Sequence, residues 1–177
     1  VFMLIALMGG GQGLKEILQN NFAGFATNTA VIWSQNTTKP YKGFDKGRQW
    51  NMEVRDMERL RQQMPELDVI TPLLFGGRKT VVFGDKKFSG STQGVNADYA
   101  EVSAPKLFYG RYINEMDVKQ QRKVCVIGEQ IYKNLFPGGG DPCGKSLRVD
   151  STYYTVVGVD YLSGNGVNFG GRADETI

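Results

Sequence analysis

The spacing of apolar residues changes along this chain, and its first part has the spacing of a helix. Eight consecutive apolar residues, Val1 to Met8, open the sequence and are followed by three glycines. Further apolar residues recur at helical intervals after the glycines: Leu14, Ile17, Leu18, Phe22 and Phe25. Such a stripe predicts one helix that continues directly from the opening run.

The opening run itself has three interpretations. Eight residues of helix cover about 12 Å, well short of the roughly 20 residues that a complete membrane span needs. The run fits the outer end of a transmembrane helix, an ordinary buried strand or helix turn, or the remnant of a signal peptide. Because the apolar stripe that follows has the form of a helix leaving a membrane, we interpret residues 1–26 as a transmembrane end and its helical extension.

A strand, a helix and a second strand are predicted between residues 27 and 75. Thr27–Thr38 is rich in β-branched residues, which is typical of a strand. After Asn51, a suitable N-cap, apolar residues recur at helical spacing until Pro65, and we expect them to be buried: Val54, Met57, Leu60 and Met64. Asp68–Phe75 returns to strand composition. This order predicts a βαβ unit.

The following section is richer in strands, and the change near Gly76-Gly77 is the best candidate for a boundary. Arg78–Phe83 and Lys86–Val95 flank Gly84-Asp85, a pair that favours a tight hairpin turn. Residues 98–108 form a short helix or turn broken by a proline, and Lys123–Ile127 has the composition of a buried strand.

The glycine-rich stretch between residues 135 and 159 allows two incompatible interpretations. Gly139–Ser146 matches the G-x-x-x-x-G-K-[ST] pattern, which holds phosphates in nucleotide-binding proteins when a strand precedes it and a helix follows. Here residues 128–136 have helical spacing, and residues 146–159 have strand composition. Because the order is reversed, we interpret the stretch as a helix-to-strand turn.

Composition narrows the function further. The chain has 177 residues, enough for one domain or two small lobes, and 41% of them are hydrophobic, as in soluble folded proteins. The net charge is +3 without a clustered basic stripe, so we expect no nucleic-acid partner. There is no histidine, which removes the commonest general base and most zinc sites. We predict no catalytic, cofactor-binding or metal-binding residue.

The two cysteines leave their redox state open, because two thiols fit one bridge or none. Cys125 lies in the apolar run Val124–Ile127, where a small buried thiol is the usual occupant. We therefore expect Cys125 and Cys143 to be unbridged.

The order of short motifs resembles the MacB-like periplasmic core domain, found in permeases of the MacB, LolC/LolE and FtsX group of ABC-type transporters. The resemblance covers nearly the whole chain. The motifs are Gly94-Val95-Asn96 with Tyr99, Leu107-Phe108-Tyr109-Gly110-Arg111, Asp117, Val124–Gly128, Leu135-Phe136, Asp141-Pro142-Cys143-Gly144-Lys145 and Val156-Val157-Gly158-Val159.

The resemblance implies an α+β fold with two lobes after the N-terminal helix. Residues 27–75 would be the first βαβ half of a porter-like lobe, incomplete in this sequence, and residues 76–162 a small strand-rich mixed α/β lobe. Residues 163–177 would be a loop leading to a second porter segment.

The motif positions would be structural in such a domain. Gly144 would take a backbone conformation that other residues avoid, Pro142 would fix the turn, and Lys145 would start the next strand. Gly158 would allow a bulge or a close approach in its strand. The same structural role is expected at the remaining motif positions, Gly110, Arg111, Gly128 and Asp141.

The resemblance also implies a function without chemistry. The domain would lie on the periplasmic side of a bacterial inner membrane, held by flanking transmembrane helices, and would couple ATP hydrolysis in a separate ABC ATPase domain or subunit to export or to a periplasmic adaptor protein. The full transporter would be a homodimer or heterodimer. Two alternatives remain at this point: a binding module tethered by its N-terminus, and a nucleotide-binding enzyme using Gly139–Ser146.

Overall fold

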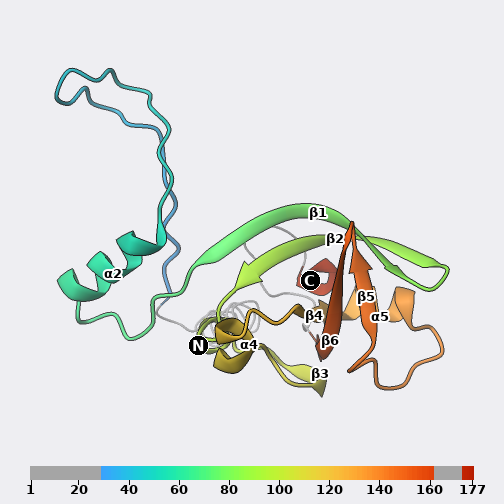
Figure 1. The fold of residues 1–177 in the computed structure, drawn as a ribbon. Helices are drawn as coiled ribbons and strands as arrows, with labels where there is room; N and C mark the ends of the chain where they lie inside the picture. The colour runs from blue at the N-terminus through green and yellow to red at the C-terminus, as the bar shows by residue number, and fades with distance from the viewer. Residues whose placement is uncertain (1–28, 162–172) are drawn as a thin grey trace, which may run out of the picture.

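The computed structural model describes residues 29–161 and 173–177, and it confirms the α+β class (Figure 1). Six strands form one sheet in the order β2-β1-β5-β6-β3, with β4 also paired to β6. The strands are β1 (Leu73–Phe83), β2 (Lys86–Val95), β3 (Leu107–Gly110), β4 (Val124–Gly128), β5 (Ser146–Val149) and β6 (Thr152–Asp160). The helices are α2 (Val54–Gln63), α3 (Tyr99–Ser103), α4 (Glu115–Lys119), α5 (Glu129–Leu135) and the short 3₁₀ helix η1 (Ala173–Glu175).

The hairpin of β1 and β2 confirms the turn predicted at Gly84-Asp85. Its last pair is Phe83 with Lys86, and Gly84 has φ +56°, the left-handed conformation that a tight turn of this kind needs. The hairpin begins earlier than expected, because β1 runs through Gly76-Gly77 with a bulge between Phe75 and Gly77. The change in composition at that point is therefore a bulge within a continuous strand.

The C-terminal residues close the sheet into a ring. Ile177 donates its N–H to the Ser91 carbonyl and accepts from the N–H of Gln93, each at 2.9 Å, which ties it to β2. On its other side, Thr176 accepts from the N–H of Gly128 at 2.9 Å, at the end of β4. Since β4 pairs with β6, β6 with β5, β5 with β1, and β1 with β2, the hydrogen bonds return to their starting strand. Residues 176 and 177 thus bridge β2 and β4, and residues 173–175 form η1, so the loop expected there is wrong for these residues.

The hydrophobic core lies between the ring and α5. Ile131 and Leu135 of α5 are four residues apart and both buried, as the helical spacing predicted. They pack with buried residues from the strands that face the helix: Val81, Ile127, Leu147, Val149, Val156 and Val159. The predicted elements at residues 123–127 and 128–136 are confirmed as β4 and α5. Between residues 146 and 159 there are two strands instead of one, because Asp150, with φ +49°, turns the chain back.

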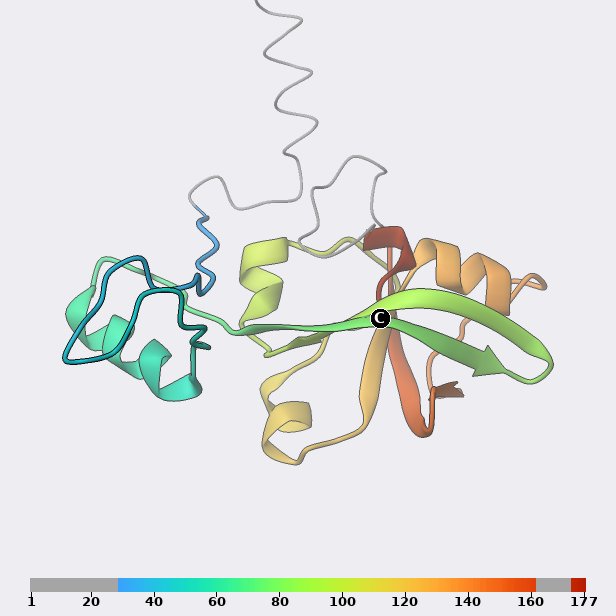
Figure 2. The same cartoon turned by 90° about the horizontal axis from the view of Figure 1, so that it is seen from above.

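Residues 29–72 differ most from the prediction. They lie beside the sheet in both views (Figures 1 and 2). The helix expected before Pro65 is confirmed as α2, but it contains no buried residue, and Val54 is 69% exposed. The strand expected over Thr27–Thr38 is wrong for its described residues, 29–38, which are irregular. The strand expected from Asp68 begins only at Leu73 and pairs antiparallel with β2.

The physical reason is the lack of a pairing partner. β-branched residues favour a strand only when a neighbouring strand accepts their hydrogen bonds and covers one face. In the described part of the chain, β1 pairs with β2 along its length and with β5 only at Val81 and Val82, and no strand pairs with residues 29–38. Without that sheet, the apolar stripe of α2 has no surface to cover. The predicted helix over residues 1–26 lies outside the described residues, and no helix among the described residues is long and apolar enough to cross a membrane.

Candidate functional site

The glycine-rich motif forms a turn between a helix and a strand. α5 precedes it and β5 follows it, so the Gly139–Ser146 segment has the reverse of the arrangement that a phosphate loop needs. The ammonium of Lys145 lies over two aromatic rings, 5.1 Å from the centre of Phe136 and 5.8 Å from the centre of Phe83. Lys145 therefore makes cation–π contacts with the edge of the core and does not face a nucleotide site.

The turn is held by its own backbone and by β6. The Asp141 carboxylate accepts the N–H of Cys143 at 2.8 Å, a local turn that residues of this type favour. Gly144 has φ +83° and donates to the Val156 carbonyl at 2.8 Å, while the Lys145 carbonyl accepts from Val156 at 2.9 Å. β5 begins at the residue after Lys145. The structural roles expected for Asp141, Gly144 and Lys145 stay predictions.

Two further glycines lie where β3 passes close to β6. An added Cβ on Gly110, which has φ +68°, would overlap the Val157 carbonyl and approach the Cys143 sulfur to 2.5 Å. A Cβ on Gly158 would overlap the Arg111 carbonyl. Gly158 also follows the bulge in the pairing of β4 with β6. The motif positions 110, 111, 143 and 158, far apart in sequence, thus meet at one crossing.

Gly128 is a motif position at the junction of two elements. It stands where β4 ends and α5 begins, and its N–H donates to Thr176 of the ring-closing segment.

Asp117 forms an ion pair with Arg111, which lies at the same crossing of β3 and β6. Its side chain is 1% exposed and pairs with Arg111 at 2.5 Å and Arg122 at 3.5 Å. It also forms a reciprocal cap with Asn114, whose side chain accepts the Asp117 N–H at 3.0 Å. The hydrogen bond from Arg111 lowers the pKa of the carboxyl. Sequence reasoning missed the helix α4 here, although Asn114 followed three residues later by an acid is its capping signal.

Neither thiol among the described residues is an activated nucleophile. Both cysteines are free. Burial raises the pKa of the Cys125 thiol to about 12, and burial together with the Asp141 carboxylate raises that of Cys143 to about 11. Neutral thiols are poor nucleophiles and poor metal ligands. No group of three or more potential metal ligands occurs in residues 29–161 and 173–177.

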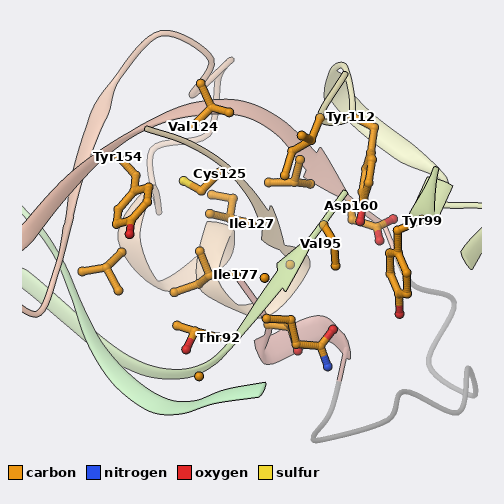
Figure 3. A pocket seen from close by; sticks show the side chains of 18 of the residues that line it. Thr92, Val95, Tyr99, Tyr112, Val124, Cys125, Ile127, Tyr154, Asp160 and Ile177 are labelled. Atoms are coloured by element: carbon orange, nitrogen blue, oxygen red, sulfur yellow. The ribbon is translucent and has the colours of Figure 1, made fainter. Parts of the chain in front are cut away.

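A cavity of about 630 Å³ is lined by strands of the ring and by no residue of this turn (Figure 3). Its walls come from β2, β4, β6, the C-terminal residues and the segment that carries α3. Val95, Ile127 and Ile177 give it an apolar middle, whereas Tyr99, Tyr112 and Asp160 gather at one end. Sequence reasoning did not predict this cavity. Its only sequence signal is an acid, Asp160, directly after the apolar run of β6.

The carboxylate of Asp160 lies in the wall of the cavity with incomplete hydrogen bonding. One carboxylate oxygen, Oδ1, is shielded from water and has no hydrogen-bond partner in the described part of the protein. Burial raises the carboxyl pKa to about 6, partly offset by a hydrogen bond from the Lys106 backbone N–H. The carboxylate in turn raises the pKa values of Tyr99 and Tyr112, for which burial is the larger cause. An uncompensated buried carboxylate of this kind costs stability when it is ionised.

Asp160→Asn is expected to stabilise the fold at neutral pH. The folded state holds a proton on Asp160 up to about pH 6, whereas the unfolded chain releases it near pH 3.9, so the native side chain destabilises the fold above pH 6. A shift of this size corresponds to at most roughly 3 kcal/mol, and partial exposure reduces the expected gain at pH 7.5 to about 1–2 kcal/mol. Urea unfolding at pH 7.5 and pH 4 measures the difference, which should vanish at pH 4.

The other titratable groups around Asp160 should not produce this pH dependence. They come from β3, α3, α5 and the adjoining segments: Tyr99, Lys106, Tyr112, Glu129, Lys133 and Tyr161. Burial raises the pKa of both Tyr99 and Tyr112, so these two groups stay protonated at pH 7.5 and at pH 4. Glu129 forms an ion pair with Lys133, and both remain present in parent and variant. An equal gain in stability at both pH values would contradict the prediction.

The comparisons with known proteins agree with the motif resemblance. The family described as "MacB-like periplasmic core domain" matches residues 1–177. The chain is 27% identical over 178 residues to the "Macrolide export ATP-binding/permease protein MacB" of Syntrophobacter fumaroxidans, covering 100% of this chain and 24% of that protein. It is 30% identical to the protein of the same description from Neisseria meningitidis serogroup A, covering 90% of this chain and 23% of the relative. The chain thus spans about a quarter of the length of these relatives.

Solved structures give the same result. The periplasmic region of MacB from Actinobacillus actinomycetemcomitans superposes with a TM-score of 0.64 at 25% identity, covering 86% of this chain and 68% of that one. The extracellular domain of the ABC-type transporter YknZ shares the fold, with a TM-score of 0.57 at 18% identity, covering 63% of this chain and 58% of that one. By its sequence along all 177 residues, this chain belongs to the family of MacB-like periplasmic core domains.

Proposed function

We propose that this chain is the extracytoplasmic domain of an ABC-type permease, on the periplasmic side of a bacterial inner membrane. It performs no chemistry itself. It transmits motion between a cytoplasmic ATPase domain or subunit and either the exported substrate or a periplasmic adaptor protein. The observation that carries the proposal is the family match over residues 1–177, together with the superposition on a MacB periplasmic region.

The structure supports a mechanical role in two ways. The described residues contain no activated thiol and no metal-ligand cluster, and the chain has no histidine. The ring of strands is also closed on itself by the C-terminal residues, so a force applied at one strand passes to the others through backbone hydrogen bonds. A rigid body of this kind moves as a unit, which suits the transmission of motion.

The other interpretations receive less support. The nucleotide-binding enzyme requires a phosphate loop, and Gly139–Ser146 lies between a helix and a strand with Lys145 over aromatic rings. The tethered binding module shares the location of the permease domain but not the connection to an ATPase. A single experiment on the full-length protein separates these possibilities.

The experiment uses Tyr153→Cys in the full-length protein. Tyr153 is 63% exposed at the start of β6, whereas the native thiols, Cys125 and Cys143, have raised pKa values and react slowly. In spheroplasts, a membrane-impermeant maleimide should label the variant and leave the parent unlabelled. In proteoliposomes with the ATPase present, an environment-sensitive label at this position should change its emission when ATP and vanadate trap the ATPase.

The maleimide labelling and the change in emission together distinguish the permease domain from the alternatives. Labelling only after the membrane is permeabilised would contradict the periplasmic location. Labelling from outside with an emission that ignores ATP would indicate a tethered module instead of a permease domain. An ATPase variant that lacks its catalytic carboxylate serves as the control, because it binds ATP and traps the closed state without turnover.

A further inference from the structure

We propose that the cavity between β2, β4, β6 and the α3 segment is a binding site for an apolar ligand that carries an amine, with the ammonium placed beside Asp160. The inference concerns the chemistry of the cavity and stands whether or not the permease assignment holds. It rests on the size of the cavity, on the charges along its walls and on the aromatic rings at its polar end.

The size and lining suit a small molecule. Ligand pockets in proteins usually enclose about 300–1,000 Å³ and combine an apolar lining with a few fixed polar groups. This cavity encloses about 630 Å³. Apolar side chains from parts of the chain far apart in sequence line the cavity, among them Leu74, Val95, Val124, Ile127 and Ile177. Figure 3 shows Val95, Ile127 and Ile177 near its middle. An apolar body placed there would be removed from water on several sides.

The wall charges select the sign of the ligand. Three carboxylates line the cavity, and two of them have cationic partners: Asp117 pairs with Arg111 and Arg122, and Asp150 pairs with Lys79 at 2.9 Å. Asp160 has no ion pair with any described residue, and its Oδ1 lacks a hydrogen bond. Arg122 and Lys79 at the other walls are already paired, and Lys106, the remaining cation of the lining, is exposed to water. The unpaired charge that is removed from water is therefore the carboxylate of Asp160.

Aromatic side chains complete the polar end. In the close view, Asp160 lies between the side chains of Tyr112 and Tyr99 (Figure 3). An ammonium placed there would meet a carboxylate and the faces or hydroxyls of tyrosines, the combination that proteins use to hold organic cations. A carboxylic acid ligand would be repelled by Asp160, and a neutral alcohol would leave the charge uncompensated. The site therefore distinguishes ligands by charge even when their apolar parts are identical.

The test uses three probes with the same eight-carbon chain: octylamine, octanol and octanoate. Each is titrated into the full 177-residue chain at pH 7.5, below its micellar concentration, and followed by the backbone amide signals of residues 99, 112 and 160 in NMR spectra. Octylammonium should bind about tenfold more tightly than the other two, as expected for one partly buried ion pair. Equal affinities, or an absence of octylammonium binding at these residues, would overturn the proposal.

Two matched variants separate the carboxylate from the apolar cavity. Asp160→Asn keeps the shape and should lower octylammonium affinity about tenfold without changing that of octanol. Asp150→Asn removes a carboxylate of the same cavity that already has a partner, and it should leave the preference for octylammonium intact. If the preference survived in Asp160→Asn, another group would hold the amine and the proposal would be wrong.

The pH dependence gives an independent reading. Octylammonium affinity should fall as the pH drops below about 6, because Asp160 takes up a proton there while the amine stays charged. The other ionisable side chains that line the cavity are Lys79, Tyr99, Lys106, Tyr112, Asp117, Arg122, Cys125, Asp150, Tyr154 and Tyr161. The pKa values of Asp117 and Asp150 are lowered by their cationic partners, so neither carboxyl titrates near pH 6. An affinity that stays constant between pH 7.5 and pH 5 would count against the role of Asp160.

Discussion

Gly110→Ala is expected to destabilise the fold by about 3 kcal/mol. Two costs add at this position. The backbone has φ +68°, a conformation that costs an alanine about 1–2 kcal/mol. The new Cβ would also overlap the Val157 carbonyl and press on the Cys143 sulfur at 2.5 Å, and forced contacts of this kind cost about 1–3 kcal/mol. The strand crossing cannot open without breaking the hydrogen bond from Arg111 N–H to Val157, which is 2.9 Å long.

Two other glycines separate these costs. Gly144 has φ +83° with nothing within 4 Å of an added Cβ, so Gly144→Ala should show only the conformational cost of about 1 kcal/mol. Gly158 lacks a positive φ, but its Cβ would overlap the Arg111 carbonyl, so Gly158→Ala should show only the contact cost, about 2 kcal/mol. Urea unfolding followed by circular dichroism measures all three. An equal loss at positions 110 and 144 would show that the close approach of β3 to β6 is absent.

Asp117→Ala is expected to cost about 3 kcal/mol, because one side chain satisfies several partners. The carboxylate pairs with Arg111 and Arg122 and caps α4 through the N–H of Asn114 at 3.2 Å. Hydrogen bonds to charged groups contribute about 1.5–3 kcal/mol each, and loss of a helix cap costs about 1 kcal/mol. The arginines are about half exposed and regain water, so the total is smaller than the sum.

The matched control lies on the same helix. Glu115 pairs with Lys119 at 2.9 Å, but both side chains are exposed, so Glu115→Ala should change the stability little. The pH dependence gives a second check with a definite sign. The folded pKa of Asp117 is lowered, so its contribution is present above the unfolded pKa near 3.9 and disappears as the pH falls through the folded pKa. Asp117→Ala should remove this part of the acid sensitivity, and an unchanged acid profile would contradict the assigned role.

Strong local patterns made part of the fold predictable. The hairpin at Gly84-Asp85, the buried strand before Gly128 and the helix with Ile131 and Leu135 were all predicted from residues that are neighbours in sequence, and the structure confirms them. The sequence also predicted that a helix precedes Gly139–Ser146 and a strand follows it, because the apolar residues of both flanking elements have clear spacing. The strand over Thr27–Thr38 failed because composition alone cannot supply a pairing partner.

The candidate site was predictable only in part. The motif residues Gly110, Asp117, Gly144 and Gly158 were identified from their order in the chain, whereas their contacts were not. Lys145, for example, lies over Phe136 and Phe83. Phe83 belongs to β1, more than 60 residues earlier in the chain, so no local pattern predicts this contact. No sequence motif indicated the cavity or the lack of an ion pair at Asp160, because the residues that line the cavity come from many separate parts of the chain.

The sequence by itself determined the local elements, the structural character of the glycine-rich turn and the family resemblance, because each depends on residue types at short spacing. Only the tertiary structure decided that residues 176 and 177 join β2 to β4, that Gly110 and Gly158 meet at one crossing, and that the Oδ1 atom of Asp160 has no hydrogen-bond partner among the described residues. The reason is that hydrogen-bond partners, close approaches and burial are set by residues distant in sequence, which no local pattern specifies.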